Sequence, residues 1–178
     1  MNAYFAGGCF WCMAKPYDTI PGVTQVVSGY CGGSADDAVY EKVKRQETQH
    51  RETVCVSYDP AVVSFSDLLE VYFYNIDPFD DGGQFIDRGR SYTCAIYWTD
   101  EQQMAAARDF ITRVERETGR TVCVSLEPFT AFYPAEDYHQ DYARKNPEAY
   151  AEEYVSSGRA GRDSLRALRE KHVSEDAE

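Results

Sequence analysis

The chain of 178 residues is 43% hydrophobic and 14% aromatic and has a formal net charge of −12. This length predicts one domain with a substantial core, and the negative charge argues against sequence-independent binding to nucleic acid or anionic membranes, which needs a basic face. No apolar run approaches the length of a membrane span, and the first residues lack a charged segment followed by an apolar one. We therefore expect a cytoplasmic protein.

The first predicted elements are a strand and a helix joined by a Gly-Gly turn. Residues 3–6 form a short apolar run typical of a strand, and residues 12–20 have a helical pattern that a Pro-Gly pair ends. Cys9 would therefore lie at the first turn of a helix, where unpaired backbone N–H groups and the helix dipole favour an anion. A thiol there loses its proton more easily, and the thiolate is the form that attacks.

Cys9 and Cys12 form a C-x-x-C pair with Phe10 and Trp11 between them. Cysteine most often fills core space, but positions i and i+3 on one helical turn lie within disulfide reach, so the pair favours redox chemistry. A metal site is less favoured, because no second C-x-x-C or histidine pair completes four ligands. The histidines are far apart in the sequence: His50, His139 and His172.

Strand and helix patterns alternate along the rest of the chain. β-branched and aromatic runs predict strands at residues 24–28, 52–58, 93–98 and 121–126. Apolar residues at helical spacing predict one helix from Phe65 to Phe73 and another from Met104 to Val114. Strands mixed with about three helices predict a compact α+β sandwich.

The C-terminal segment has a different composition. Residues 156–178 are highly charged, have few large apolar side chains and contain no cysteine. Leu165, Leu168 and Val173 could make one weak amphipathic helix, but a peripheral tail is the better prediction. We expect a globular domain at residues 1–155 and a weakly helical or partly disordered tail at residues 156–178.

The remaining cysteines are expected to be mainly structural. Cys55, Cys94 and Cys123 each lie in a β-branched or aromatic run, as small buried side chains on strands do. Cys31 lies beside glycines on a predicted flexible loop, so a redox role stays open for it. Six cysteines in 178 residues are too few for a disulfide scaffold, and a working C-x-x-C pair fits a reducing cytosol.

Glu52 is the first candidate for a general acid. It begins a predicted strand whose alternation places it on one face with Val54 and Val56. Burial on an apolar face would raise its carboxyl pKa toward neutrality, which suits an acid, although a solvated glutamate at a strand end is an equal alternative. Residues 80–89 look like an ordered loop that carries Asp87, and such loops often carry function.

Several separate motifs, in the same order, resemble the A-type peptide methionine sulfoxide reductases. They include Gly7-Gly8-Cys9-Phe10-Trp11, Gly29-Tyr30-Cys31-Gly32-Gly33, His50-Arg51-Glu52-Thr53-Val54 and the run from Phe132 to Tyr142, and they span about residues 3–146. The resemblance implies an oxidoreductase that uses a thiol to reduce methionine S-sulfoxide, protein-bound or free, to methionine. We expect a two-layer α/β sandwich with a mixed central sheet and a ferredoxin-like core.

Carried over by position, the resemblance makes Cys9 the nucleophile and Glu52 the acid that protonates the sulfoxide oxygen. The other matches bind substrate. Tyr40 and Tyr92 correspond to the hydroxyls that hold this oxygen, and Asp87 corresponds to a buried carboxylate beside the site. Phe10 and Trp11 correspond to the apolar wall that receives the S-methyl group. Attack would release methionine and leave a sulfenic acid on Cys9. No metal or organic cofactor is implied.

Many family members resolve that sulfenic acid with cysteines in a mobile C-terminal tail, but residues 156–178 contain none. Cys12, one helical turn from Cys9, is therefore the predicted resolver, and Cys31 is the second candidate. The expected product is a Cys9–Cys12 disulfide that thioredoxin or another dithiol reduces. We expect a monomer that takes oxidised proteins or free methionine sulfoxide as substrate.

Two functions of other classes stay open. A general thiol–disulfide oxidoreductase would need no acid placed like Glu52, and it would reduce insulin without acting on a sulfoxide. A non-catalytic module that recognises methionine or its sulfoxide through the aromatic residues would keep its binding after Cys9→Ser.

Overall fold

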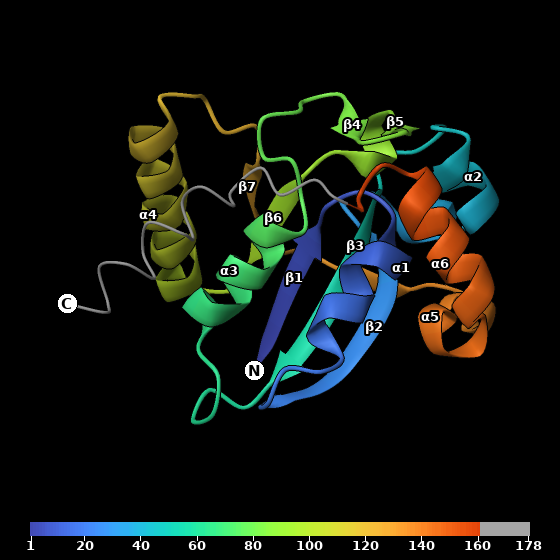
Figure 1. The fold of residues 1–178 in the computed structure, drawn as a ribbon, viewed down its shortest axis with the longest axis horizontal. Helices are drawn as coiled ribbons and strands as arrows, with labels where there is room; N and C mark the ends of the chain where they lie inside the picture. Colours follow the sequence, from blue (N-terminus) through green and yellow to red (C-terminus); the bar gives the residue numbers. More distant parts are fainter. Residues whose placement is uncertain (161–178) are drawn as a thin grey trace.

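The centre of the structure, a computed structural model that describes residues 1–160, is a six-stranded mixed sheet (Figure 1). The strands lie in the order β7-β6-β1-β3-β2-β8; β6 and β7 run parallel, and the other neighbouring pairs are antiparallel. Their bounds are Asn2–Ala6 (β1), Val23–Cys31 (β2), Arg51–Tyr58 (β3), Ala95–Trp98 (β6), Ser125–Pro128 (β7) and Phe132–Pro134 (β8).

The main helices begin and end at recognisable signals. Ser64 and Asp67 form a reciprocal capping box at the start of α3, and α4 runs from its cap Asp100 to Gly119, which is left-handed at φ 66°. The helices are Phe10–Ala14 (α1), Tyr40–Lys44 (α2), Phe65–Tyr74 (α3), Glu101–Thr118 (α4), Tyr142–Lys145 (α5) and Pro147–Ser156 (α6).

The chain follows a β-α-β-β-α-β path through β1, α1, β2, β3, α3 and β6. These strands take the spatial order β6-β1-β3-β2, which is the ferredoxin-like arrangement. Figure 1 shows α1 and α3 on the same face of the sheet. The predicted α+β sandwich with a mixed sheet and a ferredoxin-like core is therefore confirmed.

Alternation along β1 divides the interior into two parts. Ala3 and Phe5 face the main core beneath α1 and α3, whereas Tyr4 and Ala6 belong to a second cluster on the opposite face. Phe129 covers that second face by stacking on Tyr4 with ring centroids 4.1 Å apart. Burying an aromatic side chain such as Phe5, which is 0% exposed, contributes about 2 kcal/mol.

Two predicted elements are shorter or displaced. The helix predicted at residues 12–20 is the five-residue α1 followed by a 3-10 turn at Lys15–Tyr17, because Pro16 has no N–H to continue the α-helical ladder. The strand predicted at residues 121–126 begins only at Ser125, where pairing with β6 starts. Its position depends on that distant partner rather than on local pattern.

The two predicted loops also contain regular structure. Cys31 is the last residue of β2, pairs with Arg51 and Phe132, and is only 1% exposed, so it does not lie on a flexible loop. Residues 80–89 contain a small hairpin, formed by Gly83–Gln84 (β4) and Asp87–Arg88 (β5).

The first residues of the predicted tail pack against the domain. α6 ends at Ser156, and Ser157 and Arg159 beyond it are both buried. The weak helix predicted around Leu165 and Leu168 lies outside the described residues. Within residues 1–160, no helix is long and apolar enough to cross a membrane.

Candidate active site

A small pocket lies where α1, β3, the β4–β5 hairpin and α6 meet. It is lined by Cys9, Phe10, Trp11, Tyr40, Glu52, Asp87, Tyr92 and Glu153. The structure thus brings seven sequence-predicted site residues together and adds Glu153, which the sequence reasoning missed. The cavity holds about 30 Å³, roughly the space of one water, so it suits a methyl-sized group.

The turn before α1 positions Cys9. Gly8 has φ +86°, and a Cβ on it would lie 2.7 Å from the Cβ of Gln84, so only glycine fits. Cys9 caps α1, and its carbonyl accepts the N–H groups of Cys12 and Met13 at 3.1 Å each. The side chain of Cys9 is therefore held at the end of α1 and is only 6% exposed.

The thiols of Cys9 and Cys12 are hydrogen-bonded to each other. This hydrogen bond, and then burial, raise the pKa of Cys9 well above its usual value. The same hydrogen bond lowers the pKa of Cys12, with burial opposing it. The first ionisation therefore belongs to the pair, and the hydrogen bond between the two sulfur atoms holds the proton that remains. The hydrogen bond to Cys12 and burial thus oppose the easier ionisation that the position of Cys9 at the start of a helix predicts.

Glu52 is held on the sheet face that carries the main core, as its alternation with Val54 and Val56 predicts. Its Oε2 accepts the N–H of Phe10 at 3.0 Å, and the residue is 3% exposed. Burial raises the pKa of Glu52 to about 8; the Phe10 N–H works against this shift, and the negative charge of Asp87 adds to it. At neutral pH the carboxyl therefore keeps its proton and can donate it.

Tyr40 and Tyr92 bring hydroxyls to the same pocket from α2 and from the 3-10 turn Arg90–Tyr92. Burial, and then the charge of Glu52, raise the pKa of both phenols, so both remain donors at neutral pH. Gln46 ties the two segments together: its Oε1 accepts the N–H of Ser91 at 2.9 Å, and its Nε2 donates to the Ser91 hydroxyl at 2.7 Å.

The apolar wall contains more than the two predicted aromatics. Trp11 stacks on Tyr142 with centroids 3.7 Å apart, and its indole N–H donates to Nδ1 of His139 at 3.2 Å. Burial lowers the pKa of His139, so its ring is neutral and can accept. His139 also packs on Phe10 at 5.0 Å. From the sequence, His139 was interpreted as an isolated histidine, although it lies in the motif from Phe132 to Tyr142.

Asp87 reaches the pocket from the start of β5. Its Oδ2 is buried and has no hydrogen-bond partner among residues 1–160. Burial raises its carboxyl pKa, while the positive charge of Arg159 opposes the shift. Asp87 can therefore offer a free polar atom to a substrate.

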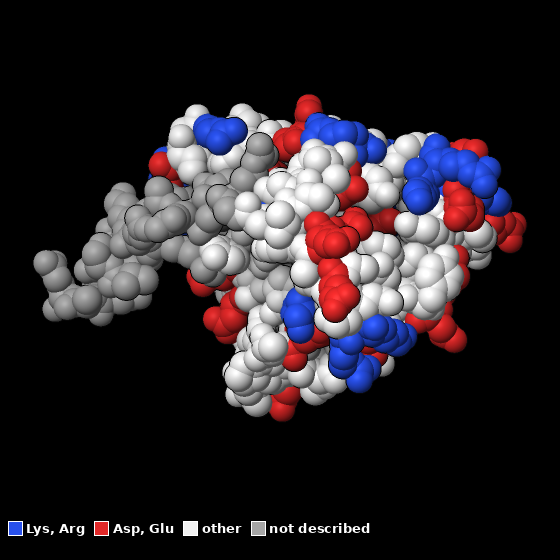
Figure 2. Space-filling model, turned by 45° about the vertical axis from the view of Figure 1, so that its right-hand side comes forward, with Lys and Arg blue, Asp and Glu red and all other residues white. Residues whose placement is uncertain are grey.

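The surface around the site is mixed in charge. Figure 2 turns the side with α5 and α6 toward the viewer, and acidic side chains gather down the middle of that face.

The described part of the chain has no group of three or more His, Cys, Asp or Glu residues arranged to hold a metal ion.

A neutral buried carboxyl, a hydrogen-bonded thiol pair and a methyl-sized pocket together define a thiol-dependent oxidoreductase that carries its own proton donor. The model of the family described as "Peptide methionine sulfoxide reductase" matches residues 1–170, and the chain belongs to this family. It therefore reduces methionine sulfoxide to methionine. The alternative of a general thiol–disulfide oxidoreductase is not favoured.

Relatives and solved structures agree with this family. The chain is 48% identical to the peptide methionine sulfoxide reductase MsrA 2 of Staphylococcus aureus strain MW2, over 88% of this chain and 90% of the relative. It is 45% identical to the MsrA of Bacillus licheniformis over 89% of each chain. Reduced Mxr1 of Saccharomyces cerevisiae superposes with TM-score 0.78 at 26% identity, covering 83% of this chain and 86% of Mxr1. The methionine sulfoxide reductase A of Corynebacterium diphtheriae gives TM-score 0.73 at 27% identity, covering 82% of this chain and 74% of the other.

Proposed function

We propose that the protein reduces the S epimer of methionine sulfoxide, protein-bound and free, with Cys9 as nucleophile, Glu52 as acid and Cys12 as resolver. The observation that carries this assignment is the buried Glu52 carboxyl, which still holds its proton at neutral pH and lines the same small pocket as the Cys9 thiol. A sulfoxide oxygen is a poor leaving group until it is protonated, so this proton is what the chemistry needs.

The pocket favours one orientation of the substrate. The S-methyl group fits the apolar side formed by Phe10 and Trp11, and the sulfoxide oxygen then faces the hydroxyls of Tyr40 and Tyr92 and the acid of Glu52. These donors are in place before substrate arrives, so they stabilise charge on the oxygen without reorganising. Asp87, with a free buried oxygen, binds a polar group of the substrate beside the sulfoxide.

In the first step, Cys9 passes its proton along the hydrogen bond to Cys12, and the Cys9 thiolate attacks the sulfoxide sulfur. Glu52 gives its proton to the sulfoxide oxygen. The bond between substrate sulfur and oxygen then breaks, and the hydroxyl moves to the Cys9 sulfur. Methionine leaves, Cys9 is oxidised to the sulfenic acid, and Glu52 remains as a carboxylate.

In the second step, Cys12 loses its proton to the Glu52 carboxylate, and its thiolate attacks the Cys9 sulfur. A Cys9–Cys12 disulfide forms, and hydroxide leaves and is protonated to water. Cys12 is suited to this step because it already contacts the Cys9 thiol. Cys31 belongs to the cluster on the opposite face of the sheet, and burial raises its pKa to about 12, so it is the weaker candidate.

A dithiol such as thioredoxin then reduces the disulfide. Yeast Mxr1 has been solved in complex with Trx2, and that structure shares the fold with TM-score 0.55 at 21% identity. The monomeric state, the cytoplasmic location and the lack of a bound cofactor stay predictions. So does the division into a domain at residues 1–155 and a tail at residues 156–178.

Single-turnover reduction of each sulfoxide epimer, followed by disulfide mapping, tests the assignment. Wild type should release one methionine from the S epimer and end with a Cys9–Cys12 disulfide. Cys9→Ser should release none, and Cys12→Ser should release one but recycle poorly with thioredoxin. Cys55→Ser, in the second core cluster, is the matched control and should behave as wild type. A Cys9–Cys31 disulfide in wild type would show that Cys12 is not the resolver.

A further inference from the structure

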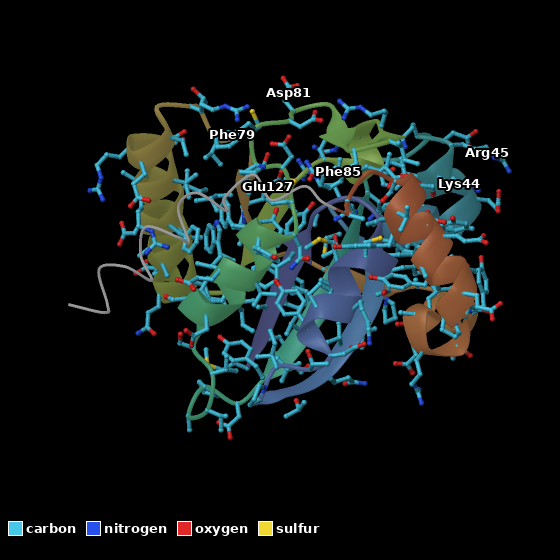
Figure 3. The ribbon with its side chains drawn as sticks, in the orientation of Figure 1. Lys44, Arg45, Phe79, Asp81, Phe85 and Glu127 are labelled. Carbon is cyan, nitrogen blue, oxygen red and sulfur yellow. The ribbon has the colours of Figure 1, made fainter. Side chains whose placement is uncertain are left out.

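Arg159 follows α6 and carries a charge into the protein interior. The residue is 4% exposed, and its two terminal nitrogens donate to the carbonyl oxygens of Gly7 and Asn75 at 2.8 Å each. Its guanidinium also lies over the ring of Phe85 at 4.7 Å. Figure 3 labels Phe85 beside the upper end of α6. A buried cation is costly to keep, so this one calls for a partner.

The end of the described chain is shaped to bring Arg159 to this position. Gly158 has φ +84°, and the carbonyl of Ser157 accepts the N–H of Ile86 at 3.4 Å, which joins this turn to the β4–β5 hairpin. The guanidinium packs closely against the Cys9 turn, because a Cβ on Gly8 would lie 2.5 Å from its Nη2. Arg159 is therefore fixed beside the segment that presents the thiol pair.

The groups around Cys12 are otherwise acidic. The charges of Glu153 on α6 and Asp87 on β5 raise the pKa of Cys12. The charge of Cys12 in turn raises the pKa of Glu52 on β3 and of Tyr150 on α6. Arg159 is the cation that acts on this cluster, and its charge lowers the pKa of Cys12 against Glu153 and Asp87. Its Nε has no hydrogen-bond partner within residues 1–160. Its two carbonyl acceptors are neutral, so the charge of Arg159 acts on the nearby Asp87 carboxyl and on Cys12.

We propose that Arg159 is a positioning residue for the resolving step: clamped to the carbonyls of Gly7 and Asn75, it holds a positive charge that stabilises the Cys12 thiolate, formed when Glu52 takes its proton, for attack on the Cys9 sulfenic acid. This inference rests on the proposed role of Cys12. The Cys12 thiolate forms the bond to the Cys9 sulfur, the Cys9 S–O bond breaks, and hydroxide takes a proton to become water. Arg159 exchanges no proton and forms no covalent bond.

Removing the positive charge of Arg159 should make the pH profile of disulfide formation cross that of wild type. If the Cys12 pKa rises by about one unit, the thiolate fraction falls about tenfold at pH below both pKa values, while the intrinsic nucleophilicity of the thiolate rises about threefold. Disulfide formation should therefore be about threefold slower at pH below both pKa values and about threefold faster at pH above both. A residue that only supports the fold would lower the rate at every pH.

The test compares Arg159→Gln with Arg159→Lys in the full chain. Gln keeps hydrogen-bond donors without charge, and Lys keeps the charge. After one turnover with S-sulfoxide, dimedone traps remaining Cys9 sulfenic acid, and mass spectrometry follows the Cys9–Cys12 disulfide across pH. Arg159→Gln should accumulate trapped sulfenic acid at the lower end of the pH range and cross the wild-type profile, and Arg159→Lys should restore the wild-type profile. The control Arg144→Gln, at an arginine on α5 whose side chain is 75% exposed, should match wild type.

The outcomes separate this inference from the proposed function. If wild type forms a disulfide other than Cys9–Cys12, the role of Cys12 fails regardless of Arg159. If wild type forms Cys9–Cys12 but Arg159→Gln shows the wild-type profile, or a uniform loss at every pH, the inference about Arg159 is overturned. Should Arg159→Gln fail to fold, Arg159→Lys decides: its profile must follow wild type, and a uniform loss there also overturns the inference.

Discussion

Replacing Glu52 by Gln should stabilise the fold while removing the acid. The glutamine keeps an oxygen that can accept the Phe10 N–H, which now lies 3.0 Å from the carboxyl, but it has no charge to bury. In wild type the folded carboxyl titrates at about 8, while the unfolded one titrates near 4.5. Because the folded pKa is the higher one, the contribution of this residue to stability is complete below 4.5 and is lost as pH rises toward 8.

The size of this loss follows from the difference in pKa. Each pH unit above 4.5 costs the folded protein about 1.4 kcal/mol until the folded carboxyl ionises, so at pH 7 the loss is about 3 kcal/mol. Since Glu52 is only 3% exposed, solvent screening reduces this figure little. Glu52→Gln should avoid the loss and melt about 10 °C higher at pH 7, with no difference from wild type near pH 4.5.

Urea unfolding of wild type and Glu52→Gln from pH 4.5 to 8 is the appropriate assay, with methionine release in one turnover measured on the same samples. Asp67→Asn is a control of opposite sign, because hydrogen bonds from Ser64 lower the pKa of Asp67. That variant should be less stable than wild type at neutral pH, and its deficit should shrink as pH falls. Equal stability of Glu52→Gln and wild type at pH 7 would mean that Glu52 is ionised when folded and cannot be the donor.

Four further outcomes follow from the same geometry. The single-turnover rate of methionine release should fall about tenfold per unit above pH 8, as Glu52 ionises; a flat rate to pH 10 would exclude it as the acid. Tyr92→Phe should slow that release about 100-fold and leave the melting temperature nearly unchanged; a wild-type rate would exclude the hydroxyl. Gly8→Ala should cost more than about 2 kcal/mol in urea unfolding, from its positive φ and its contact with Gln84, and wild-type stability would contradict the steric argument. Leu69→Ala, at a 0% exposed core position, should cost about 3 kcal/mol in the same assay; a cost below about 1 kcal/mol would mean that the core closes around it.

Local sequence patterns correctly predicted those features that depend mainly on residues close to each other in the chain. The alternation of β3 placed Glu52 on the core side with Val54 and Val56, and the structure has it there. The polar caps and Gly119 marked the ends of the long helices. The C-x-x-C spacing placed Cys12 one turn after Cys9, and the two thiols do contact each other.

Features that depend on contacts between residues far apart in the sequence could not be predicted from local patterns. Glu153 and Arg159 reach the thiol pair only because α6 folds back over α1, which no local periodicity shows. Cys31 looks mobile beside its glycines, but pairing on both sides makes it a strand residue. The raised pKa of Cys9 likewise follows from its hydrogen bond to Cys12 and from burial, which only the packed structure supplies.

The position of β1 in the middle of the sheet affects how this protein is made. β1 is synthesised before both of its partners, because β3 and β6 follow about 50 and 90 residues later, and the Arg159 contact to Gly7 spans 152 residues. At typical translation speeds the cysteine pair leaves the ribosome on the order of 10–30 s before its counter-charge exists. Such distant pairings also fold slowly. A newborn chain therefore carries its thiols without the acid and cation that tune them, and oxidants would meet ordinary cysteines until the C-terminal end of the domain arrives.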